Sequence, residues 1–210
     1  MKNLIILGAG GMGKTIYSIA TNSIGYCKEF VVKGFLDYPN NEWNTDIYPP
    51  ILGFEDDYEI QSNDVFVCSI GDVHIKRKIC EKMESRGAQF YTLISQKANI
   101  RHNVIIGEGT IIAEYASIGN DTIIGKNVLV QSFANIAHDC YIGDYSRLDV
   151  RSMLVGGVIV GKCVTVHTAS VLSHKVIAED DSKVGAMSLV LKRVRSGTTV
   201  FGMPAKVIEL

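Results

Sequence analysis

The sequence lacks a long apolar segment, an excess of positive charge and any paired spacing of cysteines. Its opening apolar run, Leu4–Leu7, is too short for a membrane span or a signal-peptide core, so we expect no membrane partner. The 21 Lys and Arg residues against 22 Asp and Glu give a net charge of −1, which argues against nucleic-acid binding. The five cysteines are odd in number, which favours reduced thiols in the cytoplasm over disulfides or a zinc site.

The C-terminal half contains a six-residue repeat that runs from Ile100 to Val190 without a slip. Every sixth residue is Ile, Leu or Val, apart from Ala178, and the fourth residue after each is small or β-branched, from Val104 to Val194. A period of six fits neither a helix nor an amphipathic strand, and it is typical of a parallel β-helix built from hexapeptides. Three hexapeptides make one coil, so residues eighteen apart stack in one column, at a spacing of about 4.8 Å.

The first half of the chain alternates between strand and helix patterns, which predicts a small parallel sheet covered by helices. We expect an α/β Rossmann-like domain over residues 1–95 and an all-β parallel β-helix with a C-terminal tail over 96–210. A polar, turn-rich stretch, Tyr38–Pro50, is predicted to be a surface loop. The expected strands are Leu4–Leu7, Phe30–Leu36, Val65–Ile70 and Phe90–Leu93, and the expected helices are Lys14–Asn22 and His74–Arg86.

A glycine-rich turn, Gly8–Thr15, follows the first strand and matches two phosphate-binding patterns. Gly8, Gly10 and Gly13 give the dinucleotide pattern, whereas Gly8, Gly13 and the Lys-Thr pair after it give the P-loop pattern. About 95 residues leave little room for a nucleotide triphosphatase, and only one half of a doubly wound fold fits. The remaining alternatives are a nucleotide diphosphate bound near Asp37 and Asp72, or glycines that serve only helix–strand packing.

One column of the β-helix carries a candidate general base. His138 lies at a predicted corner beside Asp139, with Asn120-Asp121 one coil below and Gly156-Gly157 one coil above. The two glycines predict a notch over the imidazole, where a glycine N–H could bind an oxyanion. A histidine held by a carboxylate can accept a proton from an amine or hydroxyl that attacks an acyl group. The other four histidines, His74, His102, His167 and His174, are interpreted as structural or peripheral.

Several motifs together resemble a known family. The hexapeptide run, Asn135–Cys140, Val184–Ala186 and the terminal Gly202–Lys206 look like left-handed β-helix acyltransferases. With the glycine-rich turn and Gly34–Asp37, the chain resembles bacterial sugar O/N-acetyltransferases of the sialic-acid O-acetyltransferase and nucleotide-4-aminosugar N-acetyltransferase type. The resemblance implies a left-handed coil and a homotrimer with its active site between subunits. It also implies acetyl-CoA as cosubstrate, with no metal required.

The resemblance also implies roles for individual residues. His138 is the expected base, with Asp139 as its partner. The expected acetyl-CoA contacts are Gly156, Thr168, Ala186, Pro204, Lys206 and Arg147, and the expected nucleotide-sugar contacts are Gly10, Gly11, Met12, Asp37, Gly71 and Gln131. Four positions of the chain depart from the family: Met12 stands for a histidine, Gln131 for an asparagine, Arg147 for a histidine and Arg151 for a glycine. A guanidinium at Arg147 or Arg151 could hold a phosphate of CoA or of the nucleotide.

The sequence therefore favours acetyl-CoA-dependent N-acetylation of a nucleotide-linked amino sugar, of the UDP-4-amino-sugar type, in surface glycan biosynthesis. Three alternatives stay open: a sugar O-acetyltransferase acting on sialic acid or a similar hydroxyl, a non-catalytic β-helix scaffold, and a nucleotide triphosphatase.

Overall fold

The computed structural model describes residues 1–39 and 43–208, and it divides into two units, Met1–Gln96 and Lys97–Leu210. Each unit is described by itself. Neither α1 nor α2, the helices among the described residues, has the length and apolar character that a membrane span requires.

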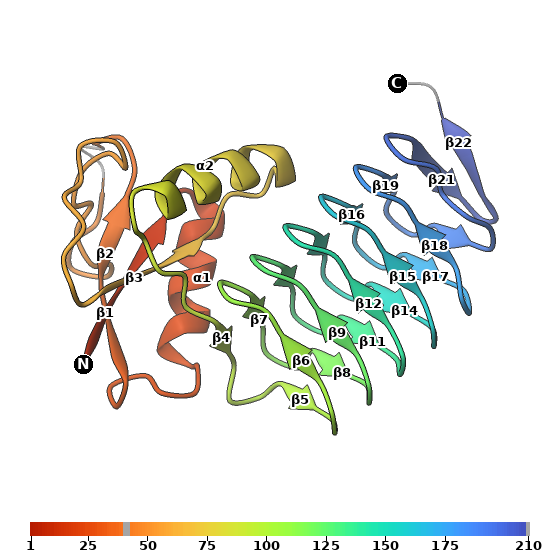
Figure 1. Cartoon of the computed structure of the whole chain (residues 1–210), viewed down its shortest axis with the longest axis horizontal. Coiled ribbons are helices and arrows are strands. Elements are labelled where there is room, and N and C mark those ends of the chain that lie inside the picture. Colours follow the sequence, from red (N-terminus) through yellow and green to blue (C-terminus); the bar gives the residue numbers. More distant parts are fainter. Residues whose placement is uncertain (40–42, 209–210) are drawn as a thin grey trace. The chain divides into compact units, whose positions relative to one another are not determined.

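The N-terminal unit is a three-stranded parallel sheet with the strand order β2-β1-β3 (Figure 1). Its strands are almost entirely buried at Leu4–Leu7 and along β3, as expected for a parallel sheet covered by helices. This confirms the predicted small α/β fold. The elements are β1 (Lys2–Leu7), α1 (Gly11–Thr21), β2 (Phe30–Leu36), β3 (Asp64–Cys68), α2 (Val73–Ser85) and β4 (Leu93–Ile94).

Two element boundaries differ most from the sequence prediction. Helix α1 begins at Gly11 rather than Lys14, because Gly10 has the extended backbone of an N-cap and the next residues are already helical. The last strand is Leu93–Ile94, whereas Phe90 makes only an isolated bridge to Phe66. Residues 40–42 of the predicted loop at 38–50 lie outside the described residues.

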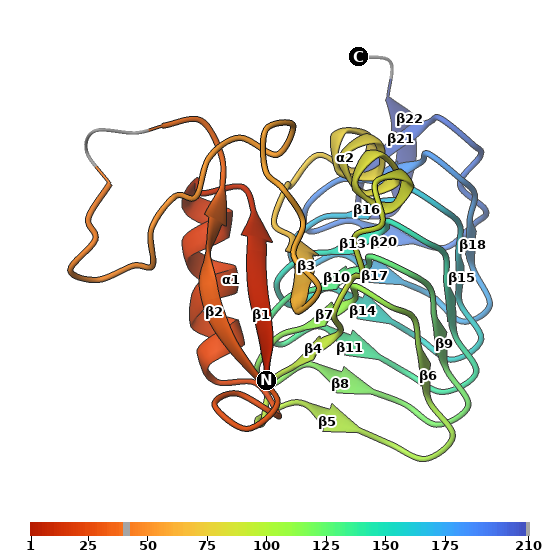
Figure 2. The same ribbon diagram turned by 60° about the vertical axis from the view of Figure 1, so that its left-hand side comes forward.

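The C-terminal unit is a parallel β-helix of two-residue strands, and Figure 2 shows the successive coils with their short connecting turns. One sheet has the order β22-β21-β19-β16-β13-β10-β7, a second β20-β17-β14-β11-β8-β5 and a third β18-β15-β12-β9-β6. Paired residues are eighteen apart, as in Leu129 with Arg147, which confirms the predicted stacking. The coil strands are β5 (Asn99–Ile100), β6 (Ile105–Ile106), β7 (Ile111–Ile112), β8 (Ser117–Ile118), β9 (Ile123–Ile124), β10 (Leu129–Val130), β11 (Asn135–Ile136), β12 (Tyr141–Ile142), β13 (Arg147–Leu148), β14 (Met153–Leu154), β15 (Ile159–Val160), β16 (Thr165–Val166), β17 (Val171–Leu172), β18 (Ile177–Ala178), β19 (Lys183–Val184) and β20 (Leu189–Val190). A hairpin of β21 (Thr199–Gly202) and β22 (Ala205–Ile208) ends the described part of the coil.

The core of this unit consists of the repeated aliphatic residues, which are at most 2 % exposed from Ile112 to Val190. The small residues of the repeat lie beside the corners, where several of their hydroxyls form hydrogen bonds with the backbone. Ser146, for example, donates to the Gly161 carbonyl at 2.7 Å and accepts from the Val164 N–H at 3.0 Å. A buried hydroxyl is tolerated there because both of its hydrogen-bonding capacities are used.

Candidate active site

The predicted base lies on what we call the first corner, formed by residues 120–121, 138–139, 156–157 and 174–175 of successive coils. The turn between β11 and β12 carries His138 and Asp139, and their Nδ1 and Oδ2 atoms are 2.6 Å apart. Asp139 has a left-handed backbone with a φ of 57°, which bends the chain so that two successive side chains can meet. Both side chains are largely exposed, at 63 % and 65 %.

At the notch predicted at Gly156, the imidazole of His138 itself occupies the space that glycine leaves. A Cβ atom placed on Gly156 would lie 2.7 Å from both Cε1 and Nε2 of His138, which is too close for any side chain. The ring edge with the nitrogen that does not bind Asp139 therefore packs directly on the glycine. Of the two glycine N–H groups, that of Gly157 donates to the His138 carbonyl at 2.9 Å, whereas that of Gly156 has no hydrogen-bond partner within the described residues.

The coil below supports this corner through its backbone. The Asp139 N–H donates to the Asn120 carbonyl at 3.0 Å, and the Asn120 side chain accepts the His102 N–H at 3.2 Å. Asn103 donates to Asp121 at 2.7 Å in the neighbouring column. These contacts are structural, so the arrangement keeps the corner in register beneath His138.

The second corner, residues 131–133, 149–151, 167–169 and 185–187, holds a group that sequence reasoning missed. Buried Asp149 accepts hydrogen bonds from Gln131 at 2.7 Å, from Arg147 and from His167 at 3.0 Å. His167, interpreted from the sequence as structural or peripheral, has its ring held by a carboxylate one coil below. The signal was present: Gln131, Asp149 and His167 are eighteen apart, in one column.

Of the expected acetyl-CoA contacts, Gly156 lies on the first corner, Arg147 on β13, two on the second corner and two on the terminal hairpin. Thr168 and Ala186 are exposed turn residues after β16 and β19. Pro204 lies in the hairpin turn between β21 and β22, and Lys206 is exposed on β22. The Arg151 guanidinium lies over the Phe133 ring at 5.8 Å.

In the N-terminal unit, the glycines of the turn have different structural roles. Gly8 has a φ of +98°, and Gly13 packs so tightly on the Gly8 carbonyl that a Cβ atom would collide with it. Gly10 and Gly11 instead face open space, where a Cβ atom would meet nothing within 4 Å. Helix α1 has no side-chain cap, so its first N–H groups are available to an anion.

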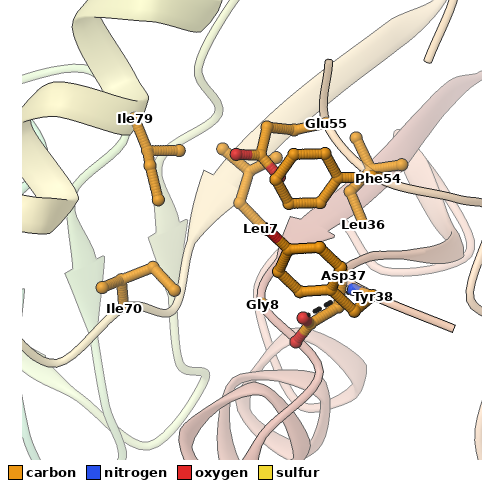
Figure 3. A pocket seen from close by; sticks show the side chains of 9 residues that line it. All are labelled: Leu7, Gly8, Leu36, Asp37, Tyr38, Phe54, Glu55, Ile70 and Ile79. Carbon is orange, nitrogen blue, oxygen red and sulfur yellow. Dashed lines mark hydrogen bonds between the residues drawn. The ribbon is translucent and has the colours of Figure 1, made fainter. Parts of the chain in front are cut away.

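A pocket of about 260 Å³ opens at the carboxyl ends of β1 and β2 (Figure 3). Asp37 is fixed at its rim, because Oδ2 accepts the Ala9 N–H and Oδ1 the Tyr38 N–H, both at 2.7 Å. The rings of Tyr38 and Phe54 are stacked with centroids 4.4 Å apart. The lining is Leu7, Gly8, Leu36, Asp37, Tyr38, Phe54, Glu55, Ile70 and Ile79, and sequence reasoning had singled out only Gly8 and Asp37 among these.

The other predicted residues of this unit lie around the turns rather than in that lining. Met12 follows the open glycines in the first turn of α1, and Gly71 lies between β3 and α2. Asp72 caps α2, accepting the N–H groups of His74 and Ile75 at 2.9 Å. The Lys14 ammonium lies over the rings of Trp43 and Tyr48, at 5.4 and 5.3 Å, so its position does not favour the P-loop interpretation.

Comparison with models of known protein families gives one match in each unit. Residues 3–83 match the family model of the PglD N-terminal domain, and residues 121–149 match the model of the bacterial transferase hexapeptide of six repeats. A search of curated proteins found no match.

Several solved structures are similar over nearly the whole chain. The acetyltransferase domain of PglB from Neisseria gonorrhoeae is 23 % identical, with 99 % of this chain and 100 % of that chain covered and a TM-score of 0.88. The same domain has been solved in complex with acetyl coenzyme A. PerB from Caulobacter crescentus, in complex with CoA and GDP-perosamine, is 23 % identical over 100 % and 98 % of the chains with a TM-score of 0.88. WeeI from Acinetobacter baumannii is 21 % identical over 99 % and 100 %, with a TM-score of 0.73. These likenesses confirm the predicted fold, an α/β domain followed by a left-handed β-helix.

Proposed function

We propose that this chain catalyses the acetyl-CoA-dependent N-acetylation of a nucleotide-linked amino sugar. It belongs to the bacterial hexapeptide transferases and carries a PglD N-terminal domain. The observation that carries the proposal is the first corner. There one nitrogen of His138 binds a carboxylate and the other lies beside Gly156, in a side chain that is 63 % exposed, so a reacting group can approach it.

The geometry supports His138 as the general base. Because Asp139 can only accept a hydrogen bond when ionised, Nδ1 carries the hydrogen and Nε2 has the free electron pair. The sugar amine attacks the thioester carbonyl carbon, forming the C–N bond, and Nε2 takes the proton that the nitrogen loses. The Gly156 N–H, which has no partner among the described residues, can hold the negative oxygen of the tetrahedral intermediate. Collapse breaks the C–S bond, and the CoA thiolate leaves and is protonated.

The N-terminal pocket supports an acceptor that is bound through a nucleotide. Its aromatic pair and the fixed Asp37 carboxylate suit a nucleoside, and the uncapped start of α1 at Gly10 and Gly11 suits a diphosphate. We assign the acceptor to the UDP-4-amino-sugar type, with Met12, Gly71 and Gln131 as further contacts. We assign the acetyl-CoA contacts to Thr168, Ala186, Pro204, Lys206 and Arg147, in a cytoplasmic homotrimer that serves surface glycan synthesis.

The test is thiol release from acetyl-CoA with a panel of UDP-, dTDP- and GDP-linked amino sugars. Release with at least one amino sugar is expected, and His138→Ala should reduce kcat by about 10²- to 10⁴-fold while His174→Ala, on the same corner, leaves it unchanged. Release only with sialic acid or another hydroxyl acceptor would establish the O-acetyltransferase instead. No release with any acceptor, together with no rise in melting temperature on adding acetyl-CoA, would favour the scaffold.

A further inference from the structure

The second corner contains a histidine that the proposed reaction does not use. His167 is the uppermost member of a column in which Gln131, Asp149 and His167 follow one another at intervals of one coil. Arg147, the first residue of β13, reaches the same carboxylate from two residues away. Asp149 is 3 % exposed, so four hydrogen-bond donors from three coils meet at one buried carboxylate.

The carboxylate has no remaining acceptor position. Oδ1 accepts from Gln131 Nε2 and Arg147 Nε, and Oδ2 accepts from Arg147 Nη2 and His167 Nδ1, both at 3.0 Å. Burial alone would raise the pKa of Asp149, but the hydrogen bonds from His167 and Arg147 outweigh burial and lower it. Asp149 therefore stays ionised and acts only as an acceptor.

This arrangement fixes which nitrogen of His167 faces outward as an acceptor. Because Asp149 can only accept, Nδ1 must carry a hydrogen, and in the neutral ring Nε2 then has the free electron pair. The His167 side chain is 41 % exposed, so Nε2 can meet a ligand while Nδ1 is held from within. A nitrogen of this kind binds a neutral donor such as an amide N–H, and it does not bind a phosphate.

The neighbours of His167 are the residues assigned to the acyl donor. Thr168 follows it directly, and Gly185 is the next residue in its column. The Phe201 ring of β21 occupies the space that a side chain on Gly185 would need, and Phe201 is paired with Lys206 across the hairpin. His167 thus lies on the corner that carries Thr168 and Ala186, and the next residue of its column packs against the terminal hairpin.

We propose that His167 Nε2 accepts a hydrogen bond from an amide N–H of the pantetheine arm of the acyl donor, an inference that rests on the proposed function. The arm is the uncharged part of coenzyme A and carries two amide N–H groups. Asp149, with Arg147 and Gln131, is a positioning group that sets the tautomer and the direction of the ring.

The experiment compares coenzyme A with a fragment that lacks the arm and the phosphate joined to it. Titration calorimetry measures the affinity of the wild-type protein, His167→Ala and the control His174→Ala for coenzyme A and for adenosine 3′,5′-bisphosphate, which lacks pantetheine. We expect His167→Ala to weaken binding of coenzyme A by about 3- to 30-fold, the effect of one hydrogen bond, and to leave the bisphosphate affinity unchanged. His174→Ala should change neither affinity.

The outcomes separate this inference from the proposed function. Unchanged coenzyme A affinity in His167→Ala, or an equal loss for both ligands, would overturn the contact while leaving the acyltransferase proposal in place. A wild-type protein that binds no coenzyme A would overturn both. Imidazole ¹⁵N spectra of the wild type give a second measurement that needs no variant: we expect the Nδ1–H tautomer for His167, and an Nε2 shift with coenzyme A but not with the bisphosphate. An Nε2–H tautomer would contradict the inference.

Discussion

Replacing Gly156 with alanine tests whether the position of the His138 ring against this glycine is needed for catalysis. The new Cβ would lie 2.7 Å from Cε1 and Nε2 of His138, whereas an ordinary contact begins at 3.4 Å, so the ring must move by the difference, about 0.7 Å. The ring is the exposed end of a flexible side chain, and it can move without disturbing the core. A displacement of about 1 Å can reduce a rate by 10²-fold, so we expect kcat to fall by about 10- to 100-fold.

The same substitution should not destabilise the fold. Gly156 is not among the positive-φ glycines. At such a position alanine stabilises a protein by about 0.4–1 kcal/mol, because it lowers the conformational entropy of the unfolded chain. Steady-state kinetics and a thermal melt of the same preparation therefore separate catalysis from stability. Gly157→Ala is the control for catalysis, because its Cβ would meet only the flexible Lys175 side chain at 3.0 Å, and we expect its kcat to stay within about threefold of wild type. Its φ of +72° disfavours alanine, so we expect this variant, unlike Gly156→Ala, to melt at a lower temperature. A normal kcat in Gly156→Ala would refute the assignment of the His138 ring edge beside Gly156 as the reaction site.

Two further predictions concern the N-terminal unit. Asp37→Asn removes one of the two acceptor oxygens that hold the Ala9 and Tyr38 N–H groups. We expect weaker nucleotide binding in calorimetry and a loss of about 1–3 kcal/mol in the free energy of unfolding by urea. An unchanged nucleotide affinity would contradict the role of Asp37. Burial would raise the pKa of Asp64, but its hydrogen bonds, including that from Lys33, lower it. The ionised carboxylate therefore stabilises the folded state fully above about pH 4, and this stabilisation is lost as the pH falls through the pKa of Asp64 in the folded protein. Asp64→Asn should flatten the fall in urea midpoint between about pH 4 and 2, and a fall as steep as in wild type would disprove the assignment.

The fold of the C-terminal unit could be predicted because one residue in six decides it. The inward side chain is almost always Ile, Leu or Val, and the corner residues follow it at fixed distances. The start of α1 was harder to predict, because glycines at residues 10, 11 and 13 are typical of a turn, yet the chain is helical from Gly11 onward and Gly13 packs on the Gly8 carbonyl. Phe90 has the residue type of a strand, yet it makes only one bridge.

The candidate sites were predictable to the extent that their residues share a period. His138 and Gly156 were found because they stand eighteen apart in a repeat. The residues Tyr38, Phe54 and Glu55 of the N-terminal pocket were missed because they lie in irregular segments, where no periodicity relates them.

The missed pair of His167 with Asp149 shows what distinguishes the two His–Asp pairs of this chain. Sequence reasoning looked for an acid adjacent to a histidine, as Asp139 is to His138, whereas Asp149 lies one coil below its histidine. The carboxylates also differ in what else they bind. Asp139 is exposed, so its negative charge can strengthen the interaction as His138 becomes positive. Asp149 is buried and already accepts hydrogen bonds from Gln131 and Arg147 besides that from His167. The first pair thus lies where a reacting group can reach it, whereas the second holds its ring in one direction.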